Sequence, residues 1–185
     1  EICACLVGSE MCIRDRLTTV PGVTVYSPSD TAELSQCLEQ ALYKDKGIVA
    51  VRYPRGCELY RSGTKAYSDF RHVSNKSRKL IFTYGRISAY AYTIHGVDVL
   101  QAIKIFPIYD EIIDICLAYD EIYAFEEGER EGGIAQKLCT ALALAGFKGR
   151  FTITAVDGFV RHADVATQLH NAMLDADGMR KITGE

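Results

Sequence analysis

The sequence predicts an α/β protein that contains the end of one βαβ domain, followed by a three-layer domain with a mostly parallel sheet. Two observations lead to this prediction. Short apolar runs rich in β-branched and aromatic residues alternate with segments of helical apolar spacing along residues 23–182. A stretch without sustained periodicity, residues 57–78, divides this alternation into two parts.

The first part is predicted to be a strand, a helix and a second strand. Residues 23–26 form the first strand. Ser29 or Asp30 can then cap a helix over residues 31–43 through its side-chain oxygen. Residues 48–53 are apolar and then charged, as expected of a buried parallel strand with polar groups at its carboxyl end. The apolar face of the helix is predicted to carry Leu34, Cys37, Leu38 and Ala41.

The second part alternates four predicted strands with helices. Because strands and helices alternate, the sheet should be mostly parallel and covered on both faces. The predicted strands are residues 80–84, 97–105, 121–125 and 151–156. The predicted helices are residues 87–95, 109–118, 133–145, 165–174 and 177–182.

Composition excludes several classes of function. The formal net charge is -3, whereas a general nucleic-acid binder is normally basic. No apolar run approaches the roughly 20 residues that span a bilayer. The cysteines number seven, an odd count, and Cys37, Cys116 and Cys139 fall on apolar helical stripes. No signal peptide precedes the domain, so we expect a cytoplasmic protein with reduced thiols and no nucleic-acid or membrane partner.

Residues 1–16 are set apart from the fold prediction. Cys3, Cys5 and Cys12 could suggest a metal site, but their spacing fits no paired-ligand pattern and no histidine lies nearby. Residues 6–16 resemble the translation of a transposase-based sequencing adaptor, and such a scar does not contribute to a fold. Residues 1–5 are left unassigned.

Motifs at five places, in order, resemble one enzyme family. Residues 20–30 match an "IPG...PSD" passage, and residues 52–56 read Arg-Tyr-Pro-Arg-Gly after an apolar strand. Residues 105–108 lead from a phenylalanine to a proline, residues 125–133 resemble "VEEN...GG", and residues 157–163 resemble "DRFVEHG". Together these motifs resemble 1-deoxy-D-xylulose-5-phosphate synthases of the transketolase superfamily, over about residues 17–185.

The resemblance implies a domain organisation. Residues 17–56 would be the C-terminal part of a pyrimidine-binding domain, residues 57–78 a linker, and residues 79–185 a transketolase C-terminal-like domain. The linker itself matches nothing in the family.

The resemblance also implies a reaction for the full-length enzyme. That transferase would condense pyruvate with glyceraldehyde 3-phosphate to 1-deoxy-D-xylulose 5-phosphate and carbon dioxide, for isoprenoid, thiamine and pyridoxal biosynthesis. It would be a homodimer that uses thiamine diphosphate and magnesium, bound mainly by N-terminal sequence that is missing here. We therefore expect this chain alone to be inactive, with no catalytic, cofactor-binding or metal-binding residue of its own.

Arg55 is the main candidate for a binding residue. By resemblance it binds the phosphate of the aldehyde substrate, which suits a guanidinium because it can donate two hydrogen bonds to phosphate oxygens. A surface ion pair is the alternative for this residue. Arg52 is the second candidate for the phosphate, although pairing with a buried carboxylate is favoured for it.

Two further features have structural interpretations. Glu126, Glu127, Glu129 and Glu131 are predicted to lie in a loop entering a helix, where the helix dipole favours acidic residues. A paired-carboxylate acid/base site is the alternative. His162 follows the last predicted strand and is expected to be a hydrogen-bonded structural histidine, or else a contact to a neighbouring domain or subunit.

Two other functions stay open. The chain could be the C-terminal fragment of a transketolase or of a 2-oxo-acid dehydrogenase beta subunit, which share the architecture. It could also be a non-catalytic domain that organises a dimer. The Arg-Tyr-Pro-Arg-Gly motif at residues 52–56 favours the synthase.

Overall fold

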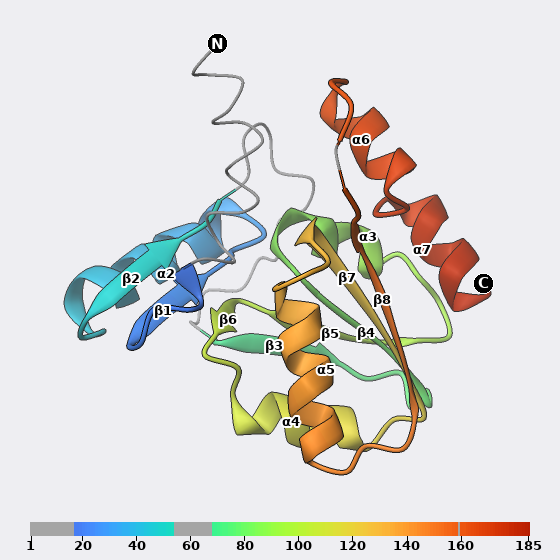
Figure 1. Ribbon diagram of the computed structural model, residues 1–185, viewed down its shortest axis with the longest axis horizontal. Helices are drawn as coiled ribbons and strands as arrows, with labels where there is room; N and C mark the ends of the chain where they lie inside the picture. The colour runs from blue at the N-terminus through green and yellow to red at the C-terminus, as the bar shows by residue number, and fades with distance from the viewer. Residues whose placement is uncertain (1–16, 54–67, 159) are drawn as a thin grey trace.

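The computed structural model describes residues 17–53, 68–158 and 160–185 (Figure 1). Its strands form a small sheet in the order β2-β1-β6 and a large sheet in the order β3-β5-β4-β7-β8. The strands are β1 (Val23–Tyr26), β2 (Ile48–Val51), β3 (Phe70–Val73), β4 (Lys79–Tyr84), β5 (Asp98–Ala102), β6 (Lys104–Phe106), β7 (Glu121–Glu129) and β8 (Arg150–Val156). The helices are α2 (Thr31–Tyr43), α3 (Ser88–Ala91), α4 (Asp110–Leu117), α5 (Ile134–Leu144), α6 (Val165–Asn171) and α7 (Ala176–Thr183).

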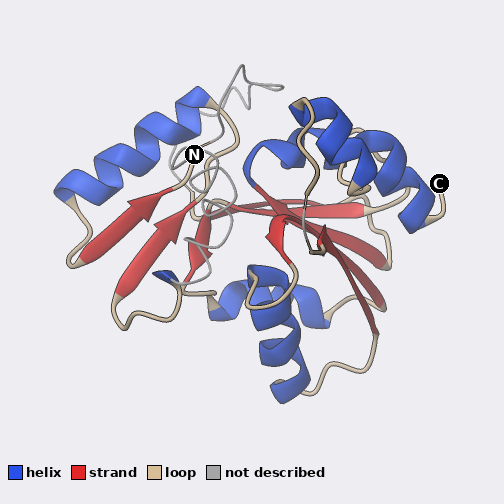
Figure 2. Cartoon of the chain, turned by 45° about the horizontal axis from the view of Figure 1, so that its top comes forward, coloured by secondary structure: helices blue, strands red, loops and turns tan. Residues whose placement is uncertain are grey.

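The large sheet has helices on both faces, which confirms the predicted three layers (Figure 2). On one face, α4 and α5 bury Ile112 and Leu138 against strand residues such as Phe82. On the other face, α3, α6 and α7 bury their apolar residues around Ile81 and Phe125. Side chains that point to opposite faces of the large sheet therefore pack into two separate cores, as expected of a sheet buried on both sides.

β3 is the antiparallel strand of the large sheet. It pairs with β5, whereas β4 pairs in parallel with β5 and β7, and β7 in parallel with β8. β3 lies inside residues 57–78, where the sequence predicted no regular element. Four residues without a clear alternation carry little local signal, so this strand depends on its partner β5.

The strand predicted over residues 97–105 is wrong as a single element. β5 ends at Ala102, and β6 begins at Lys104 and pairs antiparallel with β1 in the small sheet. The main-chain N–H groups of Ile103 and Lys104 both donate to the carbonyl of Asp69 where the chain changes sheets. A continuous apolar run does not reveal which sheet each half joins, so the sequence could not locate this break.

The small sheet confirms the predicted strand–helix–strand unit but corrects its burial. β2 is parallel to β1 as predicted, yet it is an edge strand with Ile48 57% exposed rather than a buried one. Asp30 caps α2 by accepting the main-chain N–H of Glu33. On the predicted apolar face of α2, Cys37 is buried but Leu38 is 43% exposed. The apolar face of α2 is therefore only partly buried by the described residues.

The remaining helices agree with the predictions within a few residues, with one exception. The helix predicted over residues 87–95 is a 3-10 turn at Gly85–Ile87 followed by α3, which ends at Ala91. No helix in the described part of the chain is long and apolar enough to cross a membrane.

A buried carboxylate joins the two sheets. Glu33 on α2 is 1% exposed and accepts hydrogen bonds from the main-chain N–H and hydroxyl of Ser29, at 2.7 and 2.8 Å. Gln101 on β5 donates its Nε2 to both carboxylate oxygens at 3.1 and 3.0 Å, and Arg71 on β3 places Nη2 3.0 Å from Oε1. Side chains of the large sheet thus hold the first turn of α2.

Two cysteines lie in the cores, as their positions on apolar stripes predicted. Burial raises the pKa of the Cys37 and Cys116 thiols to about 12. For Cys37 the nearby carboxylates of Glu33, Asp69 and Asp45 add to the effect. These two thiols are therefore protonated at neutral pH and behave as apolar side chains.

Candidate functional site

The carboxyl ends of strands from both sheets meet at one place. The N–H of Arg52, just after β2, donates to the carbonyl of Tyr26 at the end of β1. The N–H of Gly85, just after β4, donates at 3.2 Å to the carbonyl of Ser27. Open α/β sheets bind ligands beyond the carboxyl ends of their strands, so this junction is the candidate functional site.

Two arginines flank one glutamate at this junction. Nη2 of Arg86 lies 2.6 Å from Oε1 of Glu127, and their side chains are 12% and 15% exposed. Nη2 of Arg52 donates at 3.1 Å to the main-chain carbonyl of Glu127 and lies 3.9 Å from its Oε2. We call these three residues the Arg52–Glu127–Arg86 cluster. It has two positive charges and one negative charge, which favours anions.

A bulge in β7 places Glu127. Glu126 is paired with Ala155 of β8, but the next pair is Glu129 with Val156, so Glu127 and Gly128 have no partner in the ladder. Such extra residues bend a strand and change the direction of a side chain. Because of this bulge, the carboxylate of Glu127 reaches the two arginines rather than following the alternation of the strand.

Gly85 allows the two sheets to approach each other here. It has φ +64°, in the left-handed region that glycine tolerates, and a Cβ at this position would lie 3.0 Å from Oγ of Ser27. The same Cβ would lie 3.6 Å from Nη1 of Arg52. The missing side chain therefore leaves room for both groups at the junction.

Replacing Gly85 with alanine should lower the free energy of unfolding by about 2–3 kcal/mol, measured by urea denaturation. Left-handed backbone strain and the close contact with the buried Ser27 both contribute. Gly96→Ala is the matched control, since Gly96 has φ +69° and open space around its Cβ position. We expect a smaller loss of about 1 kcal/mol there, and an equal loss in both variants would contradict a close contact at Gly85.

The acidic cluster does not lie in a loop as predicted. Glu126, Glu127 and Glu129 belong to β7, and only Glu131 lies in the turn that follows. Glu126 is fully buried, and its Oε2 accepts the main-chain N–H of Ala135 in the first turn of α5 at 2.6 Å. The expected pairing of an acidic residue with a helix N-terminus therefore occurs through Glu126 alone in the described contacts.

Apart from Glu127, Arg52 is the one residue singled out from the sequence that the described part of the chain places in the cluster. Arg55 lies outside the described residues, as do Cys3, Cys5 and Cys12. His162 is exposed in the loop before α6. Arg52, for which pairing with a buried carboxylate was favoured, donates to the main-chain carbonyl of Glu127 and lies 3.9 Å from its Oε2. Sequence reasoning missed Arg86, whose only signal is its place directly after a strand-ending glycine.

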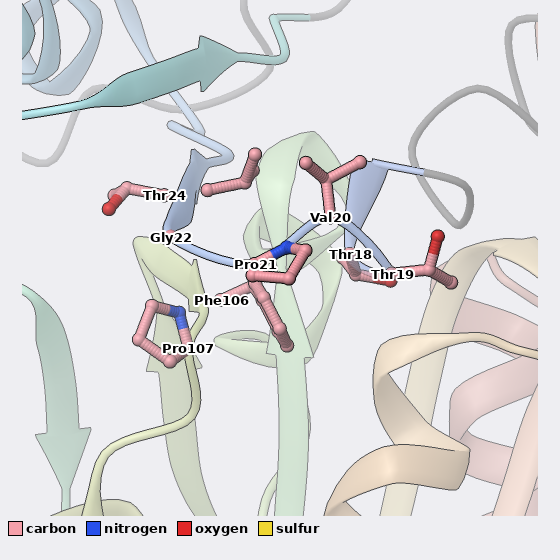
Figure 3. Close-up of a pocket in the computed structure, with 9 residues that line it drawn as sticks. Thr18, Thr19, Val20, Pro21, Gly22, Thr24, Phe106 and Pro107 are labelled. Carbon is pink, nitrogen blue, oxygen red and sulfur yellow. The ribbon is translucent and has the colours of Figure 1, made fainter.

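Two hollows of the described surface lie away from the cluster. One, of about 420 Å³, is lined by residues 18–24 together with Phe106 and Pro107, at the amino end of β1 (Figure 3). Another, of about 520 Å³, is lined by residues near the amino ends of β7 and β8, including Asp120 and Arg150. Both are at the strand ends opposite to Arg52 and contain no part of the cluster.

Known proteins resemble this chain in sequence. It is 28% identical over 174 residues, 89% of the chain, to a 1-deoxy-D-xylulose-5-phosphate synthase of Thermus thermophilus. It is 30% identical over 175 residues, 86% of the chain, to the protein of the same name from Chlorobium phaeovibrioides. This chain is a homologue of the 1-deoxy-D-xylulose-5-phosphate synthases. It spans 28% of the length of each of these two synthases.

A solved structure confirms the fold expected of a synthase homologue. The protein described as "Split gene transketolase, inactive beta4 tetramer" superimposes with a TM-score of 0.71 at 16% identity. The superposition covers 89% of this chain and 57% of that one. No family model matches the chain.

Proposed function

We propose that the chain is the C-terminal part of a 1-deoxy-D-xylulose-5-phosphate synthase. The full-length enzyme would condense pyruvate with glyceraldehyde 3-phosphate, releasing carbon dioxide, in the cytoplasm and as a homodimer. The matches to two synthases support the proposal, because each covers about nine-tenths of this chain but only 28% of the length of the synthase.

The edge of the small sheet supports the proposed domain division. Residues 17–56 would be the end of a pyrimidine-binding domain, residues 57–78 a linker, and residues 79–185 the C-terminal domain. β2 ends the small sheet with Ile48 exposed, and the neighbouring α2 exposes Leu42 at 71% and Tyr43 at 80%. A larger sheet and its helices, provided by preceding sequence, would cover this apolar surface.

The role proposed for this chain is to bind the phosphate of the aldehyde substrate through Arg55 and Arg52. The observation that carries this role is the position of Arg52 at the carboxyl end of β2, beside the second positive charge of Arg86. A guanidinium recognises phosphate through paired, charge-assisted hydrogen bonds. The side chain of Arg52 is 26% exposed, so an anion in solvent can reach it.

Thiamine diphosphate and magnesium would supply the carbon–carbon bond chemistry in the full-length enzyme. Among the described residues, no group of three or more His, Cys, Asp or Glu side chains could hold a metal ion. The described part of the chain therefore does not fit the metal, and the proposed role is limited to holding substrate.

The test is a chimera in which residues 17–185 replace the corresponding part of the Thermus thermophilus synthase. Arg55→Ala should raise the KM for glyceraldehyde 3-phosphate by about 10- to 100-fold, because a charge-assisted hydrogen bond to phosphate is lost. The KM for pyruvate should stay unchanged and serves as the internal control. The isolated chain should show no turnover. An unchanged KM for the aldehyde would remove Arg55 from the phosphate site, and turnover by the isolated chain would contradict the fragment proposal.

Self-association without catalysis is the second candidate function. The exposed apolar residues Leu42, Tyr43 and Ile48 favour it, and the similar transketolase structure is described as an inactive tetramer. The chimera separates the two candidates. An active chimera supports the synthase, whereas an inactive chimera with a dimeric isolated chain supports assembly alone.

A further inference from the structure

The two arginines of the Arg52–Glu127–Arg86 cluster hold Glu127 unequally. Arg86 makes a direct hydrogen bond of 2.6 Å to Oε1. Oε2 has no hydrogen-bond partner among the described residues, and its distance of 3.9 Å to Nη2 of Arg52 is too long for one. The carboxylate is therefore committed to Arg86 and only loosely associated with Arg52.

Arg52 is instead held by a neutral group. Its Nη2 donates to the main-chain carbonyl of Glu127, which carries no net charge. A carbonyl fixes the direction of a guanidinium without neutralising it, whereas a carboxylate would satisfy the same donors that a phosphate needs. The geometry thus leaves the charge of Arg52 available at the junction.

We propose that Arg86 is a positioning residue that keeps the carboxylate of Glu127 away from Arg52, so that Arg52 can bind the substrate phosphate. This inference rests on the proposed function, because it takes phosphate as the ligand of Arg52. Arg86 acts through Glu127 rather than on the ligand. Its side chain is 12% exposed, against 26% for Arg52, and its charge is already paired.

The position of Glu127 explains why such a residue is needed. The bulge in β7 directs this carboxylate to the same junction as Arg52, and the main-chain contact fixes Arg52 close to it. Without Arg86, Oε1 and Oε2 would both lack a strong partner, and Arg52 would be the nearest cation among the described residues. A fork-to-carboxylate pair would then form and compete with phosphate.

The proposal is tested by measuring the binding of inorganic phosphate to the 185-residue chain by calorimetry at low ionic strength. Arg86→Met should weaken phosphate binding about 10-fold, because Glu127 then pairs with Arg52. Arg86→Met combined with Glu127→Gln should restore binding to within about 3-fold of the unsubstituted chain, since the competing carboxylate is gone. Arg86→Lys, which keeps the charge, should bind nearly as well as the unsubstituted chain.

Rescue is the result that separates positioning from a structural role. A fold damaged by loss of Arg86 would not recover when Glu127 is also changed. Arg86→Gln offers the same comparison if the methionine variant does not fold, as judged by circular dichroism. Unchanged binding in Arg86→Met, or no recovery in the double variant, would overturn the inference.

Arg52→Ala and Arg55→Ala distinguish this inference from the function on which it rests. If neither of them weakens phosphate binding, or if the unsubstituted chain binds no phosphate, the proposed phosphate site is wrong and the role of Arg86 is overturned with it. If Arg52→Ala weakens binding while Arg86→Met does not, the phosphate site stands and only the role of Arg86 is wrong.

Discussion

Arg71→Met is expected to lower the free energy of unfolding by about 3–5 kcal/mol, the usual cost of leaving one member of a buried ion pair without its partner. Glu33 is 1% exposed, and Arg71 lies 3.0 Å from its Oε1. Ser29 and Gln101 would still donate hydrogen bonds to the carboxylate, but no cation would remain among the contacts described for it. Urea denaturation followed by circular dichroism measures the loss.

Arg78→Met is the matched control for this substitution. Arg78 and Asp120 form an ion pair of 2.6 Å with good geometry, but their side chains are 70% and 61% exposed. Water screens such a pair, so we expect a much smaller loss than in Arg71→Met. A double variant with Glu33→Gln should be less destabilised than Arg71→Met alone, because the buried charge is removed. Equal losses in Arg71→Met and Arg78→Met would contradict a buried ion pair that joins the two sheets.

Gly133→Ala is expected to lower the free energy of unfolding by about 3 kcal/mol, because overpacking and a broken buried hydrogen bond both contribute. The backbone of Gly133 has φ -65° and accepts any residue, so the loss must come from contacts. A Cβ there would lie 2.6 Å from the carbonyl oxygen of Glu129 and would overlap the carboxylate of Glu126. Moving that fully buried carboxylate breaks its hydrogen bond to Ala135.

Gly184→Ala provides the opposite comparison. Gly184 ends α7 with φ +80° and has open space around its Cβ position, so only backbone strain contributes. We expect a loss of about 1 kcal/mol by the same urea measurement. If Gly133→Ala were the milder change, the carboxylate of Glu126 would not be fixed against the start of α5.

The sequence predicted correctly those strands and helices whose apolar spacing and capping residues are contiguous in the chain. The strand at residues 23–26 and the helix at residues 31–43 have the bounds predicted for them, because their β-branched run, cap and helical spacing are contiguous in the sequence. Burial was harder to predict. The exposure of Ile48 depends on whether another strand lies beside β2. The sequence of β2 alone carries no information about such a neighbour.

The candidate site was predicted in part, for a similar reason. The position of Arg52 after a parallel strand could be inferred from residues 48–53, since strands deliver polar groups at their carboxyl ends. The cluster around it could not, because Glu127 reaches Arg52 through a bulge and Arg86 lies in the 3-10 turn that follows β4 of the other sheet. Bulges and pairings between sheets depend on tertiary structure rather than on local spacing.

The pairing of β6 with β1 has a consequence for how the chain folds during synthesis. β1 pairs with β6, which is synthesised after the large-sheet strands β3, β4 and β5, since β6 ends at residue 106. The small sheet therefore includes a strand that follows most of the large sheet in the sequence. We therefore expect the described strand order of the small sheet to be complete only after residue 106 has been synthesised.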